Sequence, residues 1–324
     1  MPLIKSTYHP KFPFTNTHVN TIFRTFVKPN SITYTRERLE LEDGDFMDLD
    51  NSKVGSKEVV IILHGLEGSS TSNYIMAAAN VLNANKFDIM VVNLRGCSGT
   101  DNRKFASYHS GKTEDLESVL NHVEKNHHYE TIILLGYSLG GNILLKYLGE
   151  YANHINSKVC CAIGVSVPCD LKGSSKKLAK WYNTPYMRLF LKSLKIKSLK
   201  KASLFPKYNI DTQAIAKAKN FKDYDEAFTA PANGFLSAED YWKQASSKPY
   251  LKNIQIPTLL INAQDDTFLA ESCFPIEIAK DHAHLILETP KYGGHVGFNQ
   301  YLMYKSGYWL EKRILSFIKN SNLL

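Results

Sequence analysis

Short runs of apolar, often β-branched residues recur along this chain of 324 residues and alternate with stretches whose apolar positions follow helical spacing. The runs predict buried strands, and the spaced stretches predict helices that cover them. The expected strands span residues 32–41, 46–49, 59–63, 88–94, 131–135, 159–167, 257–263 and 284–288, and the expected helices span 74–82, 114–125, 142–151 and 304–318. This alternation predicts an α/β fold with a mostly parallel central sheet flanked by helices.

The alternation stops between about residues 170 and 250, where the chain is rich in Lys, Tyr and Phe and helical in places. Because residues 170–250 lie between two expected strands, we interpret them as a mainly helical cap insertion over the carboxyl ends of the strands, where sites in such sheets lie. Residues 1–30 are expected to form an irregular N-terminal arm. A single domain over residues 1–324 is expected, since the 44% apolar and 22% charged composition is that of an ordinary globular protein.

The net charge of +8 is concentrated in the expected cap, where residues 171–210 hold ten lysines, one arginine and no acidic residue. The rest of the chain is therefore close to −3, and the local basicity does not indicate nucleic-acid binding. Four apolar residues of this stretch follow helical spacing: Met187, Phe190, Leu191 and Leu194. Basic residues gather on another face of the same expected helix. Two interpretations stay open: an apolar stripe that covers a cleft beneath solvated lysines, or an interfacial surface over residues 172–207 that makes weak contact with anionic membrane.

The five cysteines are odd in number and show no metal-ligand spacing, which predicts reduced thiols and a cytoplasmic protein. No stretch approaches the roughly 18 apolar residues that cross a bilayer, and the first residues lack the apolar core of a secretory signal. The expected location is therefore the cytoplasm, and the alternative that stays open is a peripheral contact of the cap with a membrane surface. The pairs His127–His128 and His282–His284 have no third ligand beside them in sequence, so neither a metal nor an organic cofactor is expected.

The sequence Gly-Tyr-Ser-Leu-Gly, from Gly136 to Gly140, places Ser138 between an expected strand and an expected helix. A serine at this junction requires a sharp turn, and glycines on both sides avoid collisions with the neighbouring strand and helix. The turn holds the hydroxyl above the sheet, and the N-terminal amides of the helix point at the same place. The five-residue pattern alone is a weak indication, but in this setting it predicts a nucleophile.

A serine hydroxyl is a weak nucleophile, so Ser138 requires a base and a group that orients the base. His295 follows the last expected strand in a glycine-rich loop, and Asp265 and Asp266 follow the strand before it. The order serine, aspartate, histidine is that of the α/β-hydrolases. Their acid commonly lies three residues beyond the small residue that ends the strand. Counting from Ala263 favours Asp266 as the acid, with Asp265 expected to bond the backbone of the turn.

Two backbone amides are candidates for stabilising the oxyanion of an acyl-transfer reaction. One belongs to Leu139, directly after the serine, and the other belongs to Leu66, in the loop after an earlier strand. His64 lies in the same loop, and its position indicates structural hydrogen bonding. Cys97 has no base near it in sequence and is expected to be a buried structural thiol.

The chain resembles the YheT-like group of α/β-hydrolases, also called the AB hydrolase 4 family, over nearly its whole length. That group includes bacterial esterases, eukaryotic abhydrolase-domain phospholipases and yeast medium-chain ethyl-ester synthases. The matching segments are residues 16–22, 64–69, 93–99, 108–115, 136–142 and 293–298, with 224–231, 234–235 and Tyr241 in the cap. The resemblance implies an α/β-hydrolase fold, carboxylic-ester hydrolysis and a triad at Ser138, Asp266 and His295.

The expected function is serine carboxylic-ester hydrolysis through an acyl-enzyme, with a short- to medium-chain acyl ester or lipid as the substrate. The aromatic residues of the cap favour an apolar acyl group. Two alternatives stay open. An acyltransferase or ester synthase would use an alcohol in place of water, and a non-catalytic protein would bind a ligand on the same fold without turning it over.

Overall fold

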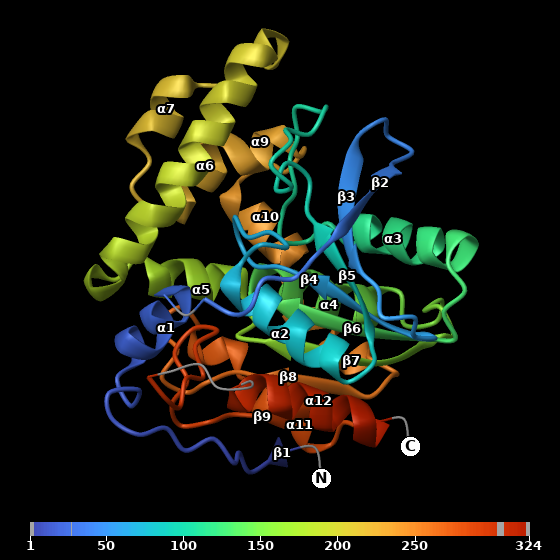
Figure 1. Cartoon of the computed structure of the whole chain (residues 1–324). Coiled ribbons are helices and arrows are strands. Elements are labelled where there is room, and N and C mark those ends of the chain that lie inside the picture. Colours follow the sequence, from blue (N-terminus) through green and yellow to red (C-terminus); the bar gives the residue numbers. More distant parts are fainter. Residues whose placement is uncertain (1–2, 27, 303–307, 322–324) are drawn as a thin grey trace.

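The computed structural model describes residues 3–26, 28–302 and 308–321. Within them the strands are β1 (Leu3–Ile4), β2 (Thr35–Glu40), β3 (Phe46–Ser52), β4 (Glu58–Leu63), β5 (Asp88–Asn93), β6 (Thr131–Tyr137), β7 (Val159–Val165), β8 (Thr258–Ile261) and β9 (Leu285–Glu288). They form one sheet in the order β1-β9-β8-β7-β6-β4-β5-β3-β2 (Figure 1). The strands from β1 to β5 in that order pair in parallel, and β3 and β2 pair antiparallel at one edge. The predicted fold class is confirmed.

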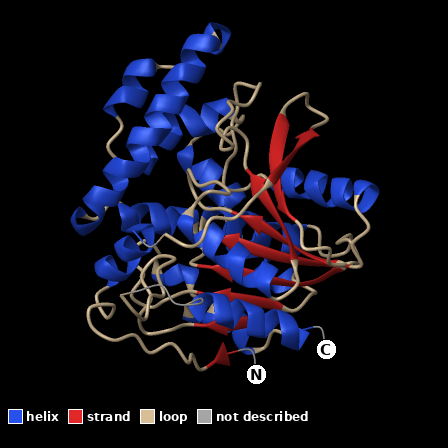
Figure 2. Cartoon of the chain, in the orientation of Figure 1, coloured by secondary structure: helices blue, strands red, loops and turns tan. Residues whose placement is uncertain are grey.

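Helices cover both faces of the sheet (Figure 2). Helices α2 (Asn73–Ala84) and α12 (Trp309–Ser321) pack on one face, with Ile75 and Ile314 in a shared apolar core. Helices α3 (Thr113–Asn126), α4 (Leu139–Glu150) and α11 (Ile276–Lys280) pack on the other face, in a second core. The sheet therefore separates two cores.

The central strands are continuously apolar between their end residues because both of their faces are covered. In β4, Val60 and Ile62 enter the core beneath α2 and α12, while Val59 and Ile61 enter the core on the opposite face. Side chains of a strand alternate between the two faces, so burial of both faces requires a continuous apolar run. This is why the apolar runs of the sequence locate the central strands correctly.

Residues between β7 and β8 form a layer of helices over the carboxyl ends of the strands. This cap comprises α5 (Leu171–Leu178), α6 (Thr184–Leu204), α7 (Thr212–Lys217), α8 (Phe221–Tyr224), α9 (Ala230–Ala232) and α10 (Ala238–Ala245), with a π turn at Asp225–Thr229. The long helix α6 and α7 lie together away from the sheet, at the upper left of Figure 1. Met187 and Leu191 of the expected apolar stripe are buried in a separate cap core.

The expectation of an irregular N-terminal arm is wrong. Residues 1–30 contain helix α1 (Thr17–Phe26) in addition to β1. The inward face of α1 carries Asn20 and Arg24, which are buried, whereas its apolar residues Val19, Ile22 and Phe26 are exposed, so the hydropathy pattern does not identify the buried face. The C-terminal helix begins at Trp309, and residues 304–307 of its expected span lie outside the described residues.

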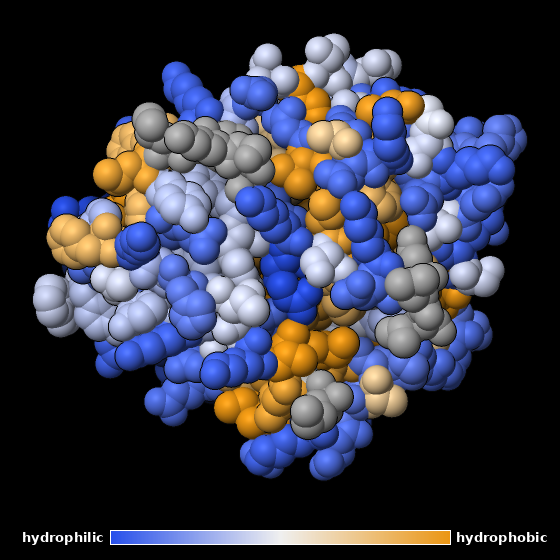
Figure 3. Space-filling view, turned by 60° about the horizontal axis from the view of Figure 1, so that its bottom comes forward, coloured by the Kyte–Doolittle hydropathy of each residue, from blue (hydrophilic) through white to orange (hydrophobic). Residues whose placement is uncertain are grey.

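On the face turned forward in Figure 3, hydrophilic side chains surround separate apolar patches. Across residues 3–26, 28–302 and 308–321, no helix is both long enough and apolar enough to cross a bilayer. The five cysteines are free thiols in the structure, four of them buried.

Candidate active site

Ser138 occupies a sharp turn between β6 and α4, with the backbone at φ 50° and ψ −118°. Few residues other than glycine adopt a positive φ, so the surrounding structure must hold this conformation in place. The glycines on both sides leave no space for a side chain. A Cβ on Gly140 would lie 2.5 Å from the carbonyl oxygen of His64, and one on Gly136 would lie 2.6 Å from the Cα of Gly141. The turn therefore presents the Ser138 hydroxyl above the sheet.

His295 lies in the loop after β9 and reaches Ser138 across 157 residues of sequence. Its Nε2 is 2.9 Å from Ser138 Oγ, and its Nδ1 is 2.8 Å from Asp266 Oδ2. In the tautomer that suits both contacts, the serine hydroxyl donates to Nε2 and the ring donates from Nδ1 to the carboxylate. The ring of Phe268 packs on the imidazole with 4.3 Å between ring centres. This geometry can transfer a proton from the serine.

The two adjacent aspartates have different surroundings. The Asp266 side chain is fully buried, and its Oδ1 accepts a hydrogen bond from the Phe268 amide at 2.9 Å. Asp265 instead accepts a hydrogen bond from the Gly294 amide at 2.9 Å and does not contact the imidazole. Burial raises the pKa of Asp265 to about 6, with the charge of Asp266 adding to the effect. The structure thus brings Asp266 to His295 and uses Asp265 to hold the loop.

Leu66 and Leu139, whose amides are expected to form the oxyanion hole, line the same cavity as Ser138. Leu139 is the first residue of α4, where amides have no acceptor within the helix. Leu66 follows Gly65, where an added Cβ would lie 3.2 Å from the Ser138 Cβ, so the missing side chain lets the loop lie against the serine. The Gly65 amide is already engaged, because it donates to the Tyr74 hydroxyl at 2.9 Å. Among the described residues none accepts a hydrogen bond from the Leu66 amide, which leaves it available to an oxyanion.

His64 has a structural role in this loop. Its Nδ1 lies 2.7 Å from the Gly65 carbonyl oxygen, and its Nε2 accepts a hydrogen bond from the Leu94 amide at 3.1 Å. Complete burial lowers the pKa of His64 to about 4, so the ring is neutral near pH 7. Cys97 is buried, and burial raises the pKa of its thiol to about 12.

Helix α1 supports the histidine loop, a role that the sequence patterns did not indicate. The Thr21 hydroxyl accepts a hydrogen bond from the His295 amide at 2.9 Å and donates to the Thr17 carbonyl at 2.8 Å. Asn299, four residues after His295, donates from its backbone amide to the Asn20 side chain and from its own side chain to the Asn20 carbonyl. The only indication in the sequence was the family resemblance of residues 16–22, without a role attached.

A cavity of about 750 Å³ opens beside Ser138 and His295, between the sheet and the cap. Its walls are mainly apolar and aromatic side chains from both layers, among them Leu139, Leu178, Phe190, Leu194, Phe228 and Phe268. Such a cavity has the size and character of a site for a small organic molecule.

Glu67 connects the Leu66 loop to the cap at the edge of this cavity. Its carboxylate accepts hydrogen bonds from the Tyr108 hydroxyl at 2.8 Å and from Ser193, and it pairs with Lys197 at 3.0 Å. The Glu67 amide also donates to the Tyr108 hydroxyl at 2.9 Å. The cap helix α6 is thereby linked directly to the segment that carries the Leu66 amide.

Comparison with known proteins shows the family to which the chain belongs. Residues 58–288 match the family described as alpha/beta hydrolase fold. The chain is 32% identical over 311 residues to the "Putative esterase YheT" of Escherichia coli, spanning 94% of this chain and 91% of the relative. It is 28% identical over 329 residues to the phospholipase ABHD3 of Homo sapiens, spanning 98% and 80%.

A solved structure shows the same fold at lower identity. The esterase Pf2001 of Pyrococcus furiosus superimposes with a TM-score of 0.61 at 17% identity, covering 90% of this chain and 91% of that one. The family match, which includes more than half of the chain, and the likeness to the bacterial relative agree with each other. The chain therefore belongs to the α/β hydrolase fold family and, within it, to the YheT-like group of carboxylic ester hydrolases.

Proposed function

We propose that this protein hydrolyses carboxylic esters through a covalent acyl-enzyme formed on Ser138. The observation that carries the proposal is the pair of contacts at His295, 2.9 Å to Ser138 Oγ and 2.8 Å to Asp266 Oδ2, beside a large apolar cavity. A nucleophile, a base and a group that orients the base are the parts that acyl transfer requires.

In the first half of the proposed reaction, Ser138 Oγ attacks the ester carbonyl carbon while His295 Nε2 takes the hydroxyl proton. The carbonyl oxygen becomes an oxyanion, and the amides of Leu66 and Leu139 donate to it. The C–O bond to the alcohol then breaks, and His295 returns the proton to the departing alkoxide oxygen. Asp266 holds the imidazole in the required tautomer and stabilises its positive charge throughout.

In the second half, water replaces the alcohol. His295 takes a proton from water as the water oxygen attacks the acyl carbon. The second oxyanion then collapses, the bond from the acyl carbon to Ser138 Oγ breaks, and His295 returns the proton to Oγ, which releases the carboxylic acid and restores the serine. An alcohol in the same position would give a new ester, which is the acyltransferase alternative. No cofactor takes part in these steps.

The proposed substrate is an ester with an apolar acyl chain of short to medium length. The apolar walls of the cavity support this proposal, because they would bury the chain at about 25 cal/mol per Å² of apolar surface. The phospholipase name of the human relative adds lipid esters to the candidates. Activity on p-nitrophenyl esters of graded acyl length would locate the optimum.

Labelling with a fluorophosphonate probe, combined with ester hydrolysis, tests the proposal. Wild-type protein should be labelled and active, whereas Ser138→Ala should be unlabelled and lose kcat by about 10⁴- to 10⁶-fold. Full ester hydrolysis by the alanine variant would refute the role of Ser138. A folded wild-type chain that is neither labelled nor active would favour ligand binding without catalysis. Ester formed from added ethanol or glycerol, measured against free acid, would distinguish transfer from hydrolysis.

We also propose that the basic cap surface, defined as residues 172–207, contacts anionic membrane while the protein is otherwise cytoplasmic. The outer face of α6 supports this, because Leu189 and Ile196 are each more than half exposed among its lysines. Leu189 also lines the cavity, so this face adjoins the proposed substrate site. Apolar side chains within a basic face are the combination that binds anionic interfaces.

Co-sedimentation with vesicles tests this contact. Binding should rise with phosphatidylglycerol content and fall with salt, and Leu189→Ser with Ile196→Ser should weaken it. Leu236→Ser is the matched control, since Leu236 is a fully exposed cap leucine outside residues 172–207. Binding that ignores both lipid charge and salt, or that the control weakens equally, would contradict the proposal.

A further inference from the structure

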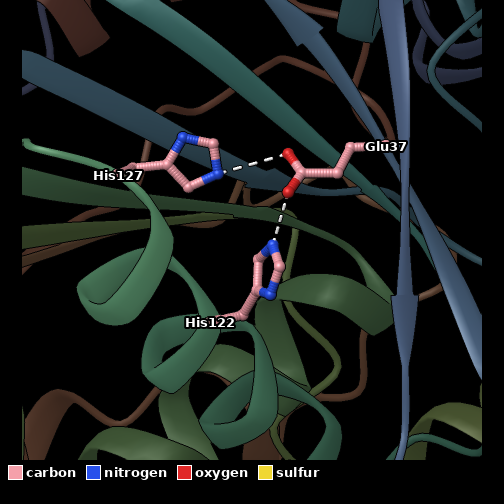
Figure 4. Close-up of side chains that lie close together, drawn as sticks. All are labelled: Glu37, His122 and His127. Atoms are coloured by element: carbon pink, nitrogen blue, oxygen red, sulfur yellow. Dashed lines mark hydrogen bonds and ion pairs between the residues drawn. The ribbon is translucent and has the colours of Figure 1, made fainter.

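Three potential metal ligands meet at the edge of the sheet opposite β1. Glu37 extends from the edge strand β2, His122 lies on α3, and His127 directly follows the end of α3. Figure 4 shows both imidazole rings pointing at the carboxylate. His122 Nε2 is 2.6 Å from Glu37 Oε1, His127 Nε2 is 3.2 Å from Glu37 Oε2, and the three ligand atoms all lie within 4.8 Å of one another.

We propose that Glu37, His122 and His127 form a binding site for a divalent transition-metal ion of the zinc class. Two imidazoles and one carboxylate are a ligand set that suits Zn²⁺, and three protein ligands leave a fourth position for water.

The spacing of the donor atoms fits such an ion after a small rearrangement. Ligand atoms about 2.0–2.1 Å from a tetrahedral zinc ion lie about 3.3 Å apart. The nearest donor pair, His122 Nε2 and Glu37 Oε1, is 2.6 Å apart, and the three ligand atoms are at most 4.8 Å apart. Binding therefore requires the nearest pair to separate by about 0.7 Å and the widest pair to approach by at most about 1.5 Å, which is within the range of side-chain rotation.

The state of the His127 nitrogen favours a ligand over a simple ion pair. The His127 side chain is only 9% exposed, and its Nε2 is buried without a well-directed hydrogen bond, although Glu37 is 3.2 Å away. A buried polar atom without a directed partner is costly, and an ion bound at this point would satisfy it. Glu37 at 31% exposed and His122 at 17% exposed keep the opposite side accessible to solvent, which gives an ion a path of entry.

Neighbouring side chains hold all three ligands in orientation. The Asn51 amide donates to Glu37 Oε2 at 3.2 Å, and the Asn126 carboxamide lies 3.1 Å from His122 Nδ1. The His127 ring stacks on Tyr129 with 5.8 Å between ring centres and 15° between planes. A metal-bound His122 would carry its proton on Nδ1, and rotation of the Asn126 carboxamide would present an oxygen to it.

The site is separate from the proposed catalytic centre. Strand β2 is four strands from β6 in the sheet, which is about 19 Å at the usual strand spacing. None of the three ligands lines the large cavity. A bound ion would therefore clamp the edge strand to the end of α3 and leave ester hydrolysis unchanged.

Zinc titration of the full chain, stripped with EDTA and free of any affinity tag, tests the proposal. Competition against a chromophoric chelator should give one site, and Zn²⁺ should raise the Tm. His122→Gln, His127→Gln and Glu37→Gln should each lower the zinc affinity by about 100-fold or more, beyond the 10- to 100-fold that supporting contacts contribute. Co²⁺ should give the absorption of a four-coordinate ion in wild-type protein and lose it in the variants.

His128→Gln is the matched control, because His128 adjoins His127 in sequence but is exposed and outside the cluster. It should bind zinc as the wild-type protein does. Circular dichroism and unchanged ester hydrolysis would establish that each variant is folded. If the variant of the more buried His127 does not fold, His122→Gln alone tests the ligand set. Wild-type protein that binds no zinc, or affinity that is the same in all three ligand variants and the control, would overturn the proposal.

Discussion

The support of His295 by helix α1 gives a quantitative prediction for Thr21→Val. Valine keeps the shape of threonine but cannot accept the hydrogen bond that the His295 amide donates at 2.9 Å. Leaving a partly buried N–H without a partner costs about 1–3 kcal/mol. If the loop escapes this cost by moving, the imidazole moves with it, because the amide and the ring belong to the same residue.

The free-energy cost converts into a rate. At about 1.4 kcal/mol per tenfold, a loss of 1–3 kcal/mol predicts a fall in kcat of about 5- to 150-fold. The fall should appear in kcat more than in KM, because Thr21 is a positioning residue and the proton transfer depends on the 2.9 Å distance between His295 Nε2 and Ser138 Oγ. Steady-state hydrolysis of a p-nitrophenyl ester, with Tm measured in parallel, checks both parts.

Two further variants separate positioning from stability. Thr21→Ser keeps the hydroxyl and should restore most of the rate. Thr25 lies on the same helix and also lines the cavity, but its hydroxyl donates only to the Ile22 carbonyl. Thr25→Val should therefore leave kcat unchanged. Thr21→Val at the wild-type rate, or a rate loss shared equally by Thr25→Val, would refute the reasoning.

Three other changes have expected outcomes. Asp266→Asn should lower kcat by about 10⁴-fold, as loss of the orienting carboxylate does in serine protease triads, while Asp265→Asn, which can still accept from Gly294, should stay within about tenfold; equal losses in both would contradict the assignment. Burial raises the pKa of Asp225 to about 6, so its contribution to stability is present below about pH 4 and is lost as the pH rises through 6. Asp225→Asn should therefore raise the unfolding free energy at pH 8 by roughly 3 kcal/mol at most, measured as a higher Tm, and leave the Tm at pH 4 unchanged. A Tm shift of the same size at both pH values would argue against this. Gly140→Ala places a Cβ 2.5 Å from a backbone carbonyl and should abolish soluble, probe-reactive protein; a labelled variant with wild-type Tm would exclude that clash.

The sequence was sufficient for features whose information is local. Strand β4 is a continuous apolar run because both of its faces are buried, and the run alone located it. The serine turn was equally local, since its glycines lie within two residues of Ser138. His295 and Asp266 could be named because each follows a strand, and parallel strands bring their carboxyl ends to one edge of the sheet.

Features built from polar contacts between distant segments were not predictable in this way. Helix α1 buries Asn20 and Arg24 and exposes Val19, Ile22 and Phe26, so its hydropathy pattern is the reverse of that of a helix packed on an apolar core. The Glu37 cluster was not predictable for a related reason, because Glu37 is 85 residues from His122 in sequence. Only the position of β2 beside the end of α3 brings these residues together.

The same distinction explains how the catalytic histidine depends on the rest of the chain. The loop of His295 contains residues at positive φ, Gly294 at 59° and Val296 at 55°, which local preferences do not hold in place. The loop is fixed by two residues of α1. Thr21 accepts a hydrogen bond from His295, 274 residues away in sequence, and Asn20 accepts one from Asn299, 279 residues away. Space at these contacts is tight, because a Cβ on Gly294 would lie 2.5 Å from Thr21 Oγ1. The position of His295 beside Ser138 therefore depends on the packing of the N-terminal helix against this loop, which makes α1 part of the active-site framework although it contributes no reacting group.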